Sequence, residues 1–451
     1  MKKALGAVAA AAAAAIALSA CTGGGAQPAS GAGDASGTIS YWLWDANQLP
    51  AYQQCADDFH KANPNITVNV TQTGWDDYWT NITNGFVGGN GPDVFTDHLS
   101  KYGDFVKNNQ LLSLDDAVKN DNVDLGQYNK GLADLWVGQD GKRYGLPKDW
   151  DTIALFYNKD MLAKAGVTAD QMGSLSWNPK DGGTFEKAIA HLTVDKNGKR
   201  GDEAGFDKNN VAVYGLGLDG GSGSGMGQTQ WSWLTGTTGW NYTDKNPWGT
   251  HFNYDDAKFQ DTITWFHRII DKGYMPKLET VVGANMADTF AAGKSAINAQ
   301  GSWMIGQYFG YKGVNVGIAP TPTGPDGKRA SMYNGLADSI NAATKNPAAA
   351  AKWVEYLGSP ACQDVVAAKA VVFPAISEAA DKASAAFKAK GIDVTPFTQQ
   401  VKDSTTFLFP ITENAAKVDG IMKPAMDAVF SGKSPASSLT DANAQVNALF
   451  Q

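Results

Sequence analysis

The chain has 451 residues, of which 43% are hydrophobic and 18% are charged, and its formal net charge is −8. This length is enough for two or more lobes with their own cores, and the composition is that of a folded protein. The negative charge disfavours nucleic acid or an anionic membrane surface as a partner. The chain also holds 14 tryptophans. Many of them stand beside Gly, Asp or Asn, which favours a surface that receives a flat ligand.

The first residues have the pattern of an export signal. Two lysines precede an apolar run over 4–18, which is too short to span a membrane. The sequence LSAC at 18–21 resembles the bacterial lipobox, so we expect a signal peptide over 1–20, cleaved before Cys21. Acyl chains (palmitate) on Cys21 would make the protein a lipoprotein at the outer face of the cell membrane. Residues 21–37 are then a flexible linker. A secreted protein with a chance cysteine is the alternative.

The first folded segment predicts a strand, a helix and a strand. Residues 38–45 and 66–72 alternate apolar and polar side chains, and residues 49–63 have one apolar face. This order is a βαβ unit. A third short strand at 93–95 leads into Thr96, Asp97 and His98. In open α/β sheets ligands bind beyond the carboxyl ends of the strands. The candidates at these ends, and at the start of the helix after 66–72, are Trp44, Asp45, Trp75, Asp97 and His98.

The stretch 141–160 is the candidate connection between two lobes. It contains a turn, a polar cluster of Asp149, Trp150 and Asp151, and an apolar run at 153–157 that predicts a buried strand. A crossing segment of this kind would place its polar cluster in the cleft between the lobes. The simpler interpretation of Asp149 is that it caps a turn.

Two features are left open by the residues alone. Cys55 and Cys362 could form a disulfide in an exported protein, but their spacing does not demand one. We favour two buried thiols, because a bridge between moving lobes would oppose their motion. The loop from Asp195 to Asp207 has some of the residues of a calcium loop, but its glycine comes two places early, so an exposed hairpin is favoured.

The later elements alternate strands and helices. Residues 301–303 would open a helix whose free N–H groups lie near Trp303. Asn334 and Gly335 would precede a strand at 339–343. The remaining predicted elements are strands at 214–218, 295–300 and 314–319, helices at 159–165, 185–192, 256–272, 286–293 and 347–357, a bend at 373–375, and helices over much of 379–451.

Six segments together carry a family resemblance: FHKANPNITVNV, NGPDVFTDH, GKRYGLPKDWDTIALFYNKDML, FAAGKSAINAQGSWMIGQY, VGIAPTP and SINAATKNPAAAAKWVEYLGSP. In this order they resemble the extracellular solute-binding proteins of bacterial ABC importers, in the carbohydrate family that includes maltose-binding protein. The resemblance implies an α/β, two-lobed periplasmic-binding-protein-like fold with a central ligand cleft and crossing hinge segments. We expect an N-terminal lobe of 38–150 plus 316–358 and a C-terminal lobe of 151–315 plus 359–451.

The resemblance also implies roles for particular residues. Trp44 with Asp45, and Asp97 with His98, would form the first two cleft loops. Asp151 stands near the place of a ligand-contacting Glu, and Trp303 at that of a stacking Trp. The chain departs from the family near its end, where Asp419 and Lys423 stand near the places of a stacking Trp and a basic contact. The candidates to replace that ring are Trp231, Trp233 and Trp240.

A sugar site needs aromatic faces together with hydrogen-bonding side chains that can serve several hydroxyls. The expected function is therefore an oligosaccharide receptor of an ABC importer, a monomer that closes on its sugar and delivers it to the permease subunits. We expect no enzymatic activity, no cofactor, no metal and no nucleic-acid partner. The predicted ligand-binding residues are Trp44, Asp45, Trp75, Asp97, His98, Asp149, Trp150, Asp151, Trp240, Gln300, Gly301, Trp303, Asn334 and Gly335.

Two other classes of function remain as alternatives. In a surface glycoside hydrolase, Asp149 and Asp151 would be about 6.6 Å apart on one strand face, a separation near those that glycosidases use. However, two acids from one strand approach a glycosidic bond from the same side, whereas the reaction needs them to flank it. In a receptor for peptides, phosphate or metal, the acidic and aromatic cleft and the lack of a His or Cys cluster would be unexpected.

Overall fold

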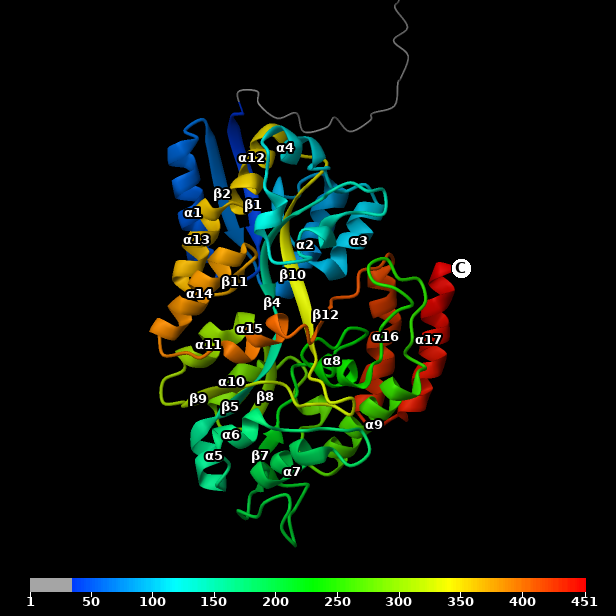
Figure 1. Ribbon diagram of the computed structural model, residues 1–451. Helices are drawn as coiled ribbons and strands as arrows, with labels where there is room; N and C mark the ends of the chain where they lie inside the picture. The colour runs from blue at the N-terminus through cyan, green and yellow to red at the C-terminus, as the bar shows by residue number, and fades with distance from the viewer. Residues whose placement is uncertain (1–34) are drawn as a thin grey trace, which may run out of the picture.

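The computed structural model describes residues 35–451. The predicted signal peptide and the predicted lipidation site Cys21 lie outside the described residues. Figure 1 shows two lobes, each built of strands flanked by helices and each with its own sheet. The α/β two-lobed fold predicted from the sequence is therefore confirmed.

The first lobe is organised around a mixed sheet with the strand order β11-β4-β10-β3-β1-β2, and β12 pairs with β10 off this path. β1 is parallel to both β2 and β3, whereas β10 is antiparallel to β3 and β4. The helix α1 connects β1 to β2, so the predicted βαβ unit is present. The strands are β1 (Gly37–Leu43), β2 (Ile66–Gln72), β3 (Val94–Asp97), β4 (Leu146–Asp151), β10 (Ser331–Ile340), β11 (Phe373–Pro374) and β12 (Thr406–Leu408).

The second lobe holds a sheet with the order β6-β7-β8-β5-β9. β5 and β8 are buried at every position, so neither strand has alternating buried and exposed residues. The strands are β5 (Ile153–Asn158), β6 (Val194–Asp195), β7 (Val211–Leu216), β8 (Ser295–Gly301) and β9 (Val316–Ala319). β6 and β7 form an antiparallel hairpin, and the Asp195 carboxylate in it accepts backbone N–H groups of Asn197, Lys199 and Asp207.

Helices cover both sheets (Figure 1). Those of the first lobe are α1 (Leu49–Ala62), α2 (Trp75–Gly88), α3 (Leu99–Lys107), α4 (Asp115–Asn120), α12 (Pro347–Leu357), α13 (Pro360–Lys369) and α14 (Ser377–Ala389). The others are α5 (Lys159–Ala165), α6 (Ala169–Gly173), α7 (Gly183–Leu192), α8 (Ser232–Thr235), α9 (Ala257–Asp271), α10 (Met286–Ala291), α11 (Ile305–Gly310), α15 (Thr395–Lys402), α16 (Ala415–Phe430) and α17 (Leu439–Asn447). No helix within residues 35–451 is both long enough and apolar enough to span a bilayer.

The segment 141–160 crosses between the lobes, as predicted. Its polar cluster belongs to β4 in the first sheet, and a single residue, Thr152, separates β4 from β5 in the second sheet. β10 runs beside this crossing, because Asn334 pairs with Asp151 and the Ser331 hydroxyl accepts the N–H of Ile153 at 2.7 Å. Two extended segments therefore join the lobes at one place.

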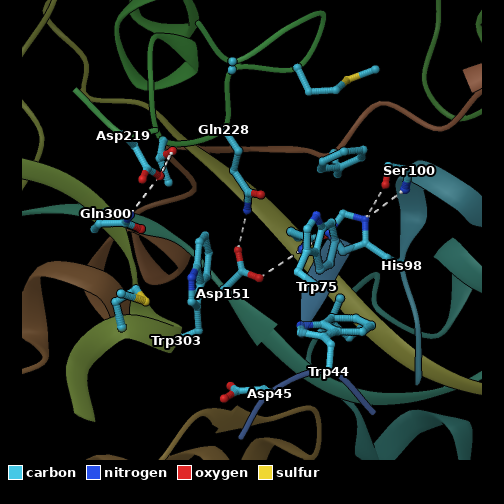
Figure 2. A pocket seen from close by; sticks show the side chains of 18 of the residues that line it. Trp44, Asp45, Trp75, His98, Ser100, Asp151, Asp219, Gln228, Gln300 and Trp303 are labelled. Carbon is cyan, nitrogen blue, oxygen red and sulfur yellow. Dashed lines mark hydrogen bonds between the residues drawn. The ribbon is translucent and has the colours of Figure 1, made fainter. Parts of the chain in front are cut away.

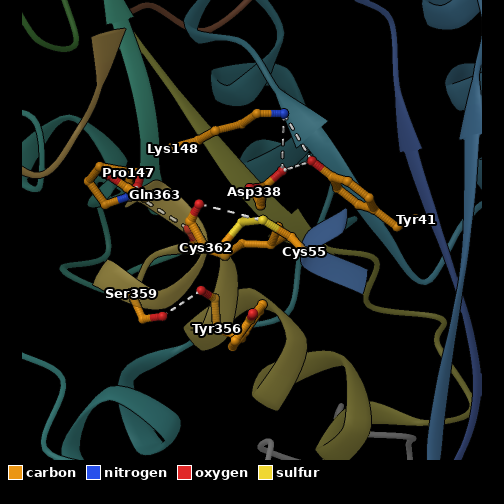
Figure 3. The surroundings of a disulfide bond; sticks show 10 residues. Tyr41, Cys55, Pro147, Lys148, Asp338, Tyr356, Ser359, Cys362 and Gln363 are labelled. Carbon is orange, nitrogen blue, oxygen red and sulfur yellow. Dashed lines mark hydrogen bonds and ion pairs between the residues drawn. A yellow bond between two sulfur atoms is a disulfide. The ribbon is translucent and has the colours of Figure 1, made fainter. Parts of the chain in front are cut away.

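Our expectation of two buried thiols is wrong. Cys55 on α1 and Cys362 on α13 form a disulfide with their Cα atoms 5.3 Å apart (Figure 3). Both helices pack in the first lobe, so the bridge does not link parts that move relative to each other. The two cysteines are 307 positions apart in the sequence, and only the fold brings them together.

Several expected elements are corrected by the strand pairing. The strand expected at 339–343 is β10, which ends at Ile340 and includes Asn334 and Gly335. All ten of its positions are buried, so no alternation marked it. The bend expected at 373–375 contains β11, which pairs with β4. The lobe boundaries stay a prediction, but β9 pairs with β5 in the second sheet rather than in the first lobe, and α13 and α14 pack on the first lobe.

Candidate ligand-binding site

A cavity of about 830 Å³ opens between the two lobes, beside the β4–β5 crossing. Its wall comes from the end of β1, from α2 and β4, from the loop after β7, and from the end of β8. The residues that border the cavity include Trp44, Asp45, Gln48, Trp75, His98, Lys101, Asp149, Trp150, Asp151, Asp219, Gln228, Thr229, Gln300, Trp303, Asn334 and Asp419.

An aromatic wall is formed on the first lobe. Trp44 follows β1, and its ring contacts that of Trp75, at the start of α2, edge-on with centroids 5.0 Å apart. The centroid of the His98 ring lies 5.3 Å from that of the Trp75 ring. Trp75 is 42% exposed although it is large and apolar. Trp303 lies across the cavity from this wall (Figure 2), so indole rings border the cavity from both lobes.

Asp151 connects three elements inside the cavity. Its carboxylate accepts the Gln228 side-chain amide at 2.7 Å and the Asn334 amide at 3.0 Å (Figure 2). Gln228 comes from the loop after β7, and Asn334 from β10. Burial, followed by the nearby charge of Asp149, raises the pKa of Asp151 well above its usual range. The last residue of β4 thus receives hydrogen bonds from both lobes.

Asp149 borders the cavity two residues before Asp151 on the same strand, and it is 2% exposed. Its Oδ2 atom has no hydrogen-bond partner among the described residues. Burial raises the pKa of Asp149 to about 7, although the nearby Lys148 charge opposes the change. The Lys148 ammonium is bound elsewhere, because it donates to the hydroxyl of Tyr41 at 2.9 Å (Figure 3) and to that of Thr96 at 2.7 Å.

Two further carboxylates border the cavity and are held by neighbouring side chains. Asp219 accepts the Thr229 hydroxyl at 2.8 Å and the Gln300 amide at 2.9 Å. Asp45 accepts the Gln48 amide at 3.0 Å. Burial raises the pKa of both carboxyl groups.

Asp97 is the last residue of β3 and His98 follows it, but the two side chains have different surroundings. The Nδ1 atom of His98 accepts the backbone N–H of Ser100 at 3.1 Å and so caps α3. Burial lowers the pKa of His98 to about 3, which keeps the ring neutral. Asp97 is fully buried behind the cavity wall, where it accepts the His98 N–H and the Ser339 hydroxyl. Burial raises the pKa of Asp97 to about 8.

The cavity brings together most of the predicted site residues. Those that border it are Trp44, Asp45, Trp75, His98, Asp149, Trp150, Asp151, Gln300, Trp303 and Asn334. Whether these residues contact a ligand stays a prediction.

Four predicted residues, Asp97, Trp240, Gly301 and Gly335, do not border the cavity. Trp240 is a core residue, because its ring stacks on Phe259 with centroids 4.7 Å apart and its Nε1 donates to the Asn253 carbonyl. Trp231 and Trp233, the other candidates to replace the missing ring, are fully buried. Gly335 faces the core, where a Cβ would lie 2.8 Å from Leu132. Gly301 acts as a spacer, since a Cβ there would overlap the Trp303 ring.

Sequence reasoning missed several residues that border the cavity: Gln48, Lys101, Asp219, Gln228, Thr229, Met286 and Phe409. Asp219 follows soon after β7, so the rule that ligands bind beyond strand ends could have found it. Gln228 follows the glycine-rich loop DGGSGSGMG, whose irregular path gives no periodic signal. Phe409 follows β12, a strand of three residues with no alternation in burial.

Comparisons with known proteins agree with the two-lobed fold. Residues 44–364 match the family of bacterial extracellular solute-binding proteins. The maltooligosaccharide ABC transporter solute-binding lipoprotein of Streptococcus pneumoniae (strain R6) is 27% identical over 78% of this chain and 75% of its own length. The maltodextrin-binding protein MdxE of Bacillus subtilis is 26% identical over 79% of this chain and 76% of its own length.

Solved structures give the same fold. An ABC substrate-binding protein from Listeria monocytogenes, in complex with cycloalternan, overlays with a TM-score of 0.77 at 19% identity, over 91% of this chain and 98% of that one. The family match covers most of the chain, from the end of β1 to α13, and both lobes follow the architecture of such receptors. The chain therefore belongs to the bacterial extracellular solute-binding proteins.

Proposed function

We propose that this protein is the carbohydrate receptor of an ABC importer, which captures an oligosaccharide between its lobes and delivers it to the permease. The observation that carries this proposal is the cavity, which indole rings border from both lobes and which also presents carboxylates and amides. A pyranose has apolar C–H faces and a ring of hydroxyls, so it needs aromatic faces and hydrogen-bonding groups together. The volume of about 830 Å³ is at the upper end for small-molecule sites, which supports more than one sugar ring.

Binding is coupled to closure through the residues beside the crossing. Trp44 belongs to the first lobe, Trp303 follows β8 of the second, and Asp151 lies where β4 passes into β5. A sugar that stacks on one ring and hydrogen-bonds to Asp151 gains the second ring only when the lobes approach. Closure is then favoured by the difference in ligand contacts between the open and closed states, with no bond made or broken.

The relatives support the sugar class and give no support to a hydrolase. The similar proteins of S. pneumoniae and B. subtilis are named for binding maltooligosaccharides and maltodextrins. Asp149 and Asp151 come from the same strand, whereas a glycosidase needs its two acids on either side of the scissile bond. We therefore propose a binding protein without enzymatic activity.

The proposal includes a lipid anchor on Cys21, which one relative's name supports because it is called a lipoprotein. We expect that Cys21→Ser would release the protein from the membrane fraction into the medium. Western blotting of both fractions measures this. Retention of the variant in the membrane fraction would contradict the anchor.

Calorimetric titration of the purified protein with a panel of mono- and oligosaccharides tests the function. We expect saturable binding of at least one oligosaccharide, with micromolar or tighter affinity. Asp151→Asn should weaken that binding, whereas Asp381→Asn, the same change on the exposed face of α14, should not. Failure of every mono- and oligosaccharide to bind would refute the proposal, and release of reducing ends from the panel would point to the hydrolase.

A further inference from the structure

The helix α15 lies where the segments that connect the two lobes meet. β4 passes into β5 at Thr152, residues 320–330 lead from β9 to β10, and residues 390–394 lead from α14 to α15. α15 packs beside β5, and the centroid of the Phe397 ring lies 5.7 Å from that of Phe156. Figure 1 shows α15 next to the crossing. Its contacts therefore affect how one lobe turns relative to the other.

α15 is hydrogen-bonded to two successive residues of the β4–β5 crossing. The Thr152 hydroxyl donates to the Phe397 carbonyl at 3.0 Å. The Gln400 amide donates to the Ile153 carbonyl at 2.8 Å. On its other side, the Thr152 carbonyl accepts the N–H of Ser302, which follows β8 of the second sheet, at 3.1 Å. Thr152 and Ile153, which are both fully buried, are therefore attached to the second lobe.

The segment that leads into β10 is attached at the same place. The Ser331 hydroxyl, at the start of β10, accepts the Ile153 N–H at 2.7 Å. The Ser331 N–H donates to the carbonyl of Thr405, which follows α15, at 3.3 Å. The Thr321 hydroxyl lies 3.1 Å from the Oε1 atom of Gln400. Gln400 thus contacts both connecting segments, the first through its amide nitrogen and the second through its amide oxygen.

Both polar atoms of the Gln400 side chain have partners, and the residue is 3% exposed. The amide nitrogen also donates to the Pro396 carbonyl at 2.9 Å. The amide oxygen accepts from the Thr321 hydroxyl, which is shared with the Ala330 carbonyl at 3.0 Å. The reversed amide would place its oxygen against two carbonyl oxygens, so these contacts fix its orientation. A buried amide with this set of partners holds its neighbours in one arrangement.

Two residues that border the cavity lie just beyond these contacts, on the side of the first lobe. Asp151 directly precedes Thr152, and Asn334 lies three residues after Ser331. Asp151 and Asn334 pair with each other in the first sheet, and both border the cavity. A rotation of the lobes is then absorbed by the backbone between this pair and the residues attached to α15.

We propose that α15 sets the position of the hinge and that Gln400 is the positioning residue that holds both connecting segments against it. This inference rests on the proposed closure of the lobes and names the residue that restricts it. Without the Gln400 amide, the Ile153 carbonyl loses its hydrogen bond to α15 and the two segments move more independently. The unliganded protein then samples a wider range of lobe angles, because fewer contacts restrict the backbone at the hinge.

The test measures distances between the lobes in the unliganded protein by double electron–electron resonance. Spin labels are attached through Lys119→Cys in α4 and Lys187→Cys in α7, since both positions are exposed and neither borders the cavity. The background is the chain with Cys21→Ser, and the bridged Cys55 and Cys362 offer no free thiol. Samples are frozen from a temperature well below the unfolding transition of each variant.

Three variants are compared with the wild type. Gln400→Met keeps the length of the side chain but removes the amide. Gln399→Met, the same change on the exposed face of α15, is the matched control. Thr152→Val keeps the shape of the side chain but removes the hydroxyl that donates to Phe397, so it is a milder change at the same contact and decides the test if Gln400→Met does not fold.

We expect the distances in Gln400→Met to cover a range about twofold wider than in the wild type, because the hinge has lost contacts that order it. Thr152→Val should widen the range in the same direction, and Gln399→Met should match the wild type. Thermal unfolding of each variant separates this role from simple stabilisation. A residue that only stabilises the fold would lower the Tm and leave the range of distances unchanged.

Equal ranges in the wild type, Gln400→Met and Thr152→Val overturn the inference. A range in Gln399→Met as wide as that in Gln400→Met also overturns it, because the effect then belongs to any change in α15. No ligand is added in this experiment, so a failure of every sugar to bind in calorimetry refutes the proposed function alone.

Discussion

Removal of the Cys55–Cys362 disulfide should destabilise the first lobe without changing ligand binding. The bridge joins α1 to α13 across 307 positions, and neither cysteine borders the cavity. For a loop of this length the chain-entropy relation gives about 5.7 kcal/mol at 25 °C. If the second lobe stays folded while the first unfolds, the flexible part of the loop is shorter, and each halving lowers the value by about 0.6 kcal/mol. Measured values for disulfides are commonly smaller, about 2 to 4 kcal/mol.

Urea unfolding of the oxidised wild type and of the double variant Cys55→Ala/Cys362→Ala measures this difference. A loss of about 2 to 5 kcal/mol should lower the midpoint by about 1 to 2 M if the lobe's urea dependence is that of a small domain. Chemical reduction of the wild type removes the cross-link but keeps both side chains, so it separates the bridge from the packing of the sulfur atoms. Equal midpoints for oxidised and reduced protein, with the bridge verified by non-reducing peptide mapping, would refute the reasoning.

Three further results are expected. Trp303→Ala should weaken sugar binding about tenfold, since it removes the indole ring from the second lobe's side of the cavity, and fluorescence titration measures this; unchanged affinity would exclude stacking there. Asp151→Asn should weaken binding by about 1 to 3 kcal/mol in calorimetry, and an undiminished affinity would exclude it as a ligand contact. The raised pKa values of Asp149 (about 7) and Asp97 (about 8) mean that the folded state holds protons which the unfolded state releases near pH 4, so their contribution to stability falls as pH rises from about 4 to 8. His98, with its lowered pKa of about 3, contributes stability that is lost as pH falls below about 6.5, so the unfolding free energy should decline between pH 6.5 and 8, and Asp97→Asn should reduce that slope.

Local patterns predicted the elements that carry a clear period or a clear boundary. The strand at 66–72 alternates, and its observed bounds are Ile66–Gln72. The helix expected at 159–165 is α5, which Asn158 caps at its start and Gly166 ends in a left-handed conformation. β10 carries neither signal, because it is buried along its whole length. The sequence therefore misplaced the strand that runs beside the crossing.

Site residues were predictable where they stand at the end of a strand. They were less predictable where tertiary packing determines whether a side chain borders the cavity or lies in the core. Trp44 and Asp151 stand at the ends of β1 and β4 and border the cavity. Trp240 also stands in a glycine-rich and polar stretch, but its ring packs in the core against Phe259. No local feature distinguishes an indole at the cavity from one in the core. The Cys55–Cys362 bridge was missed for the same reason, since the contact between α1 and α13 exists only in the folded lobe.

Asp151, which we propose as a ligand contact, also lies at the crossing between the lobes. β4 becomes β5 after one intervening residue, so a change in the angle between the lobes must be absorbed near Thr152. The hydrogen bond from Gln228 to Asp151 already links the loop after β7 to the end of β4. A sugar hydroxyl that donates to the Asp151 carboxylate would compete with the Gln228 amide. It would therefore alter the contact between the loop after β7 and the crossing. Ligand binding and lobe closure then act on one carboxylate, whose burial disfavours its charge until donors surround it.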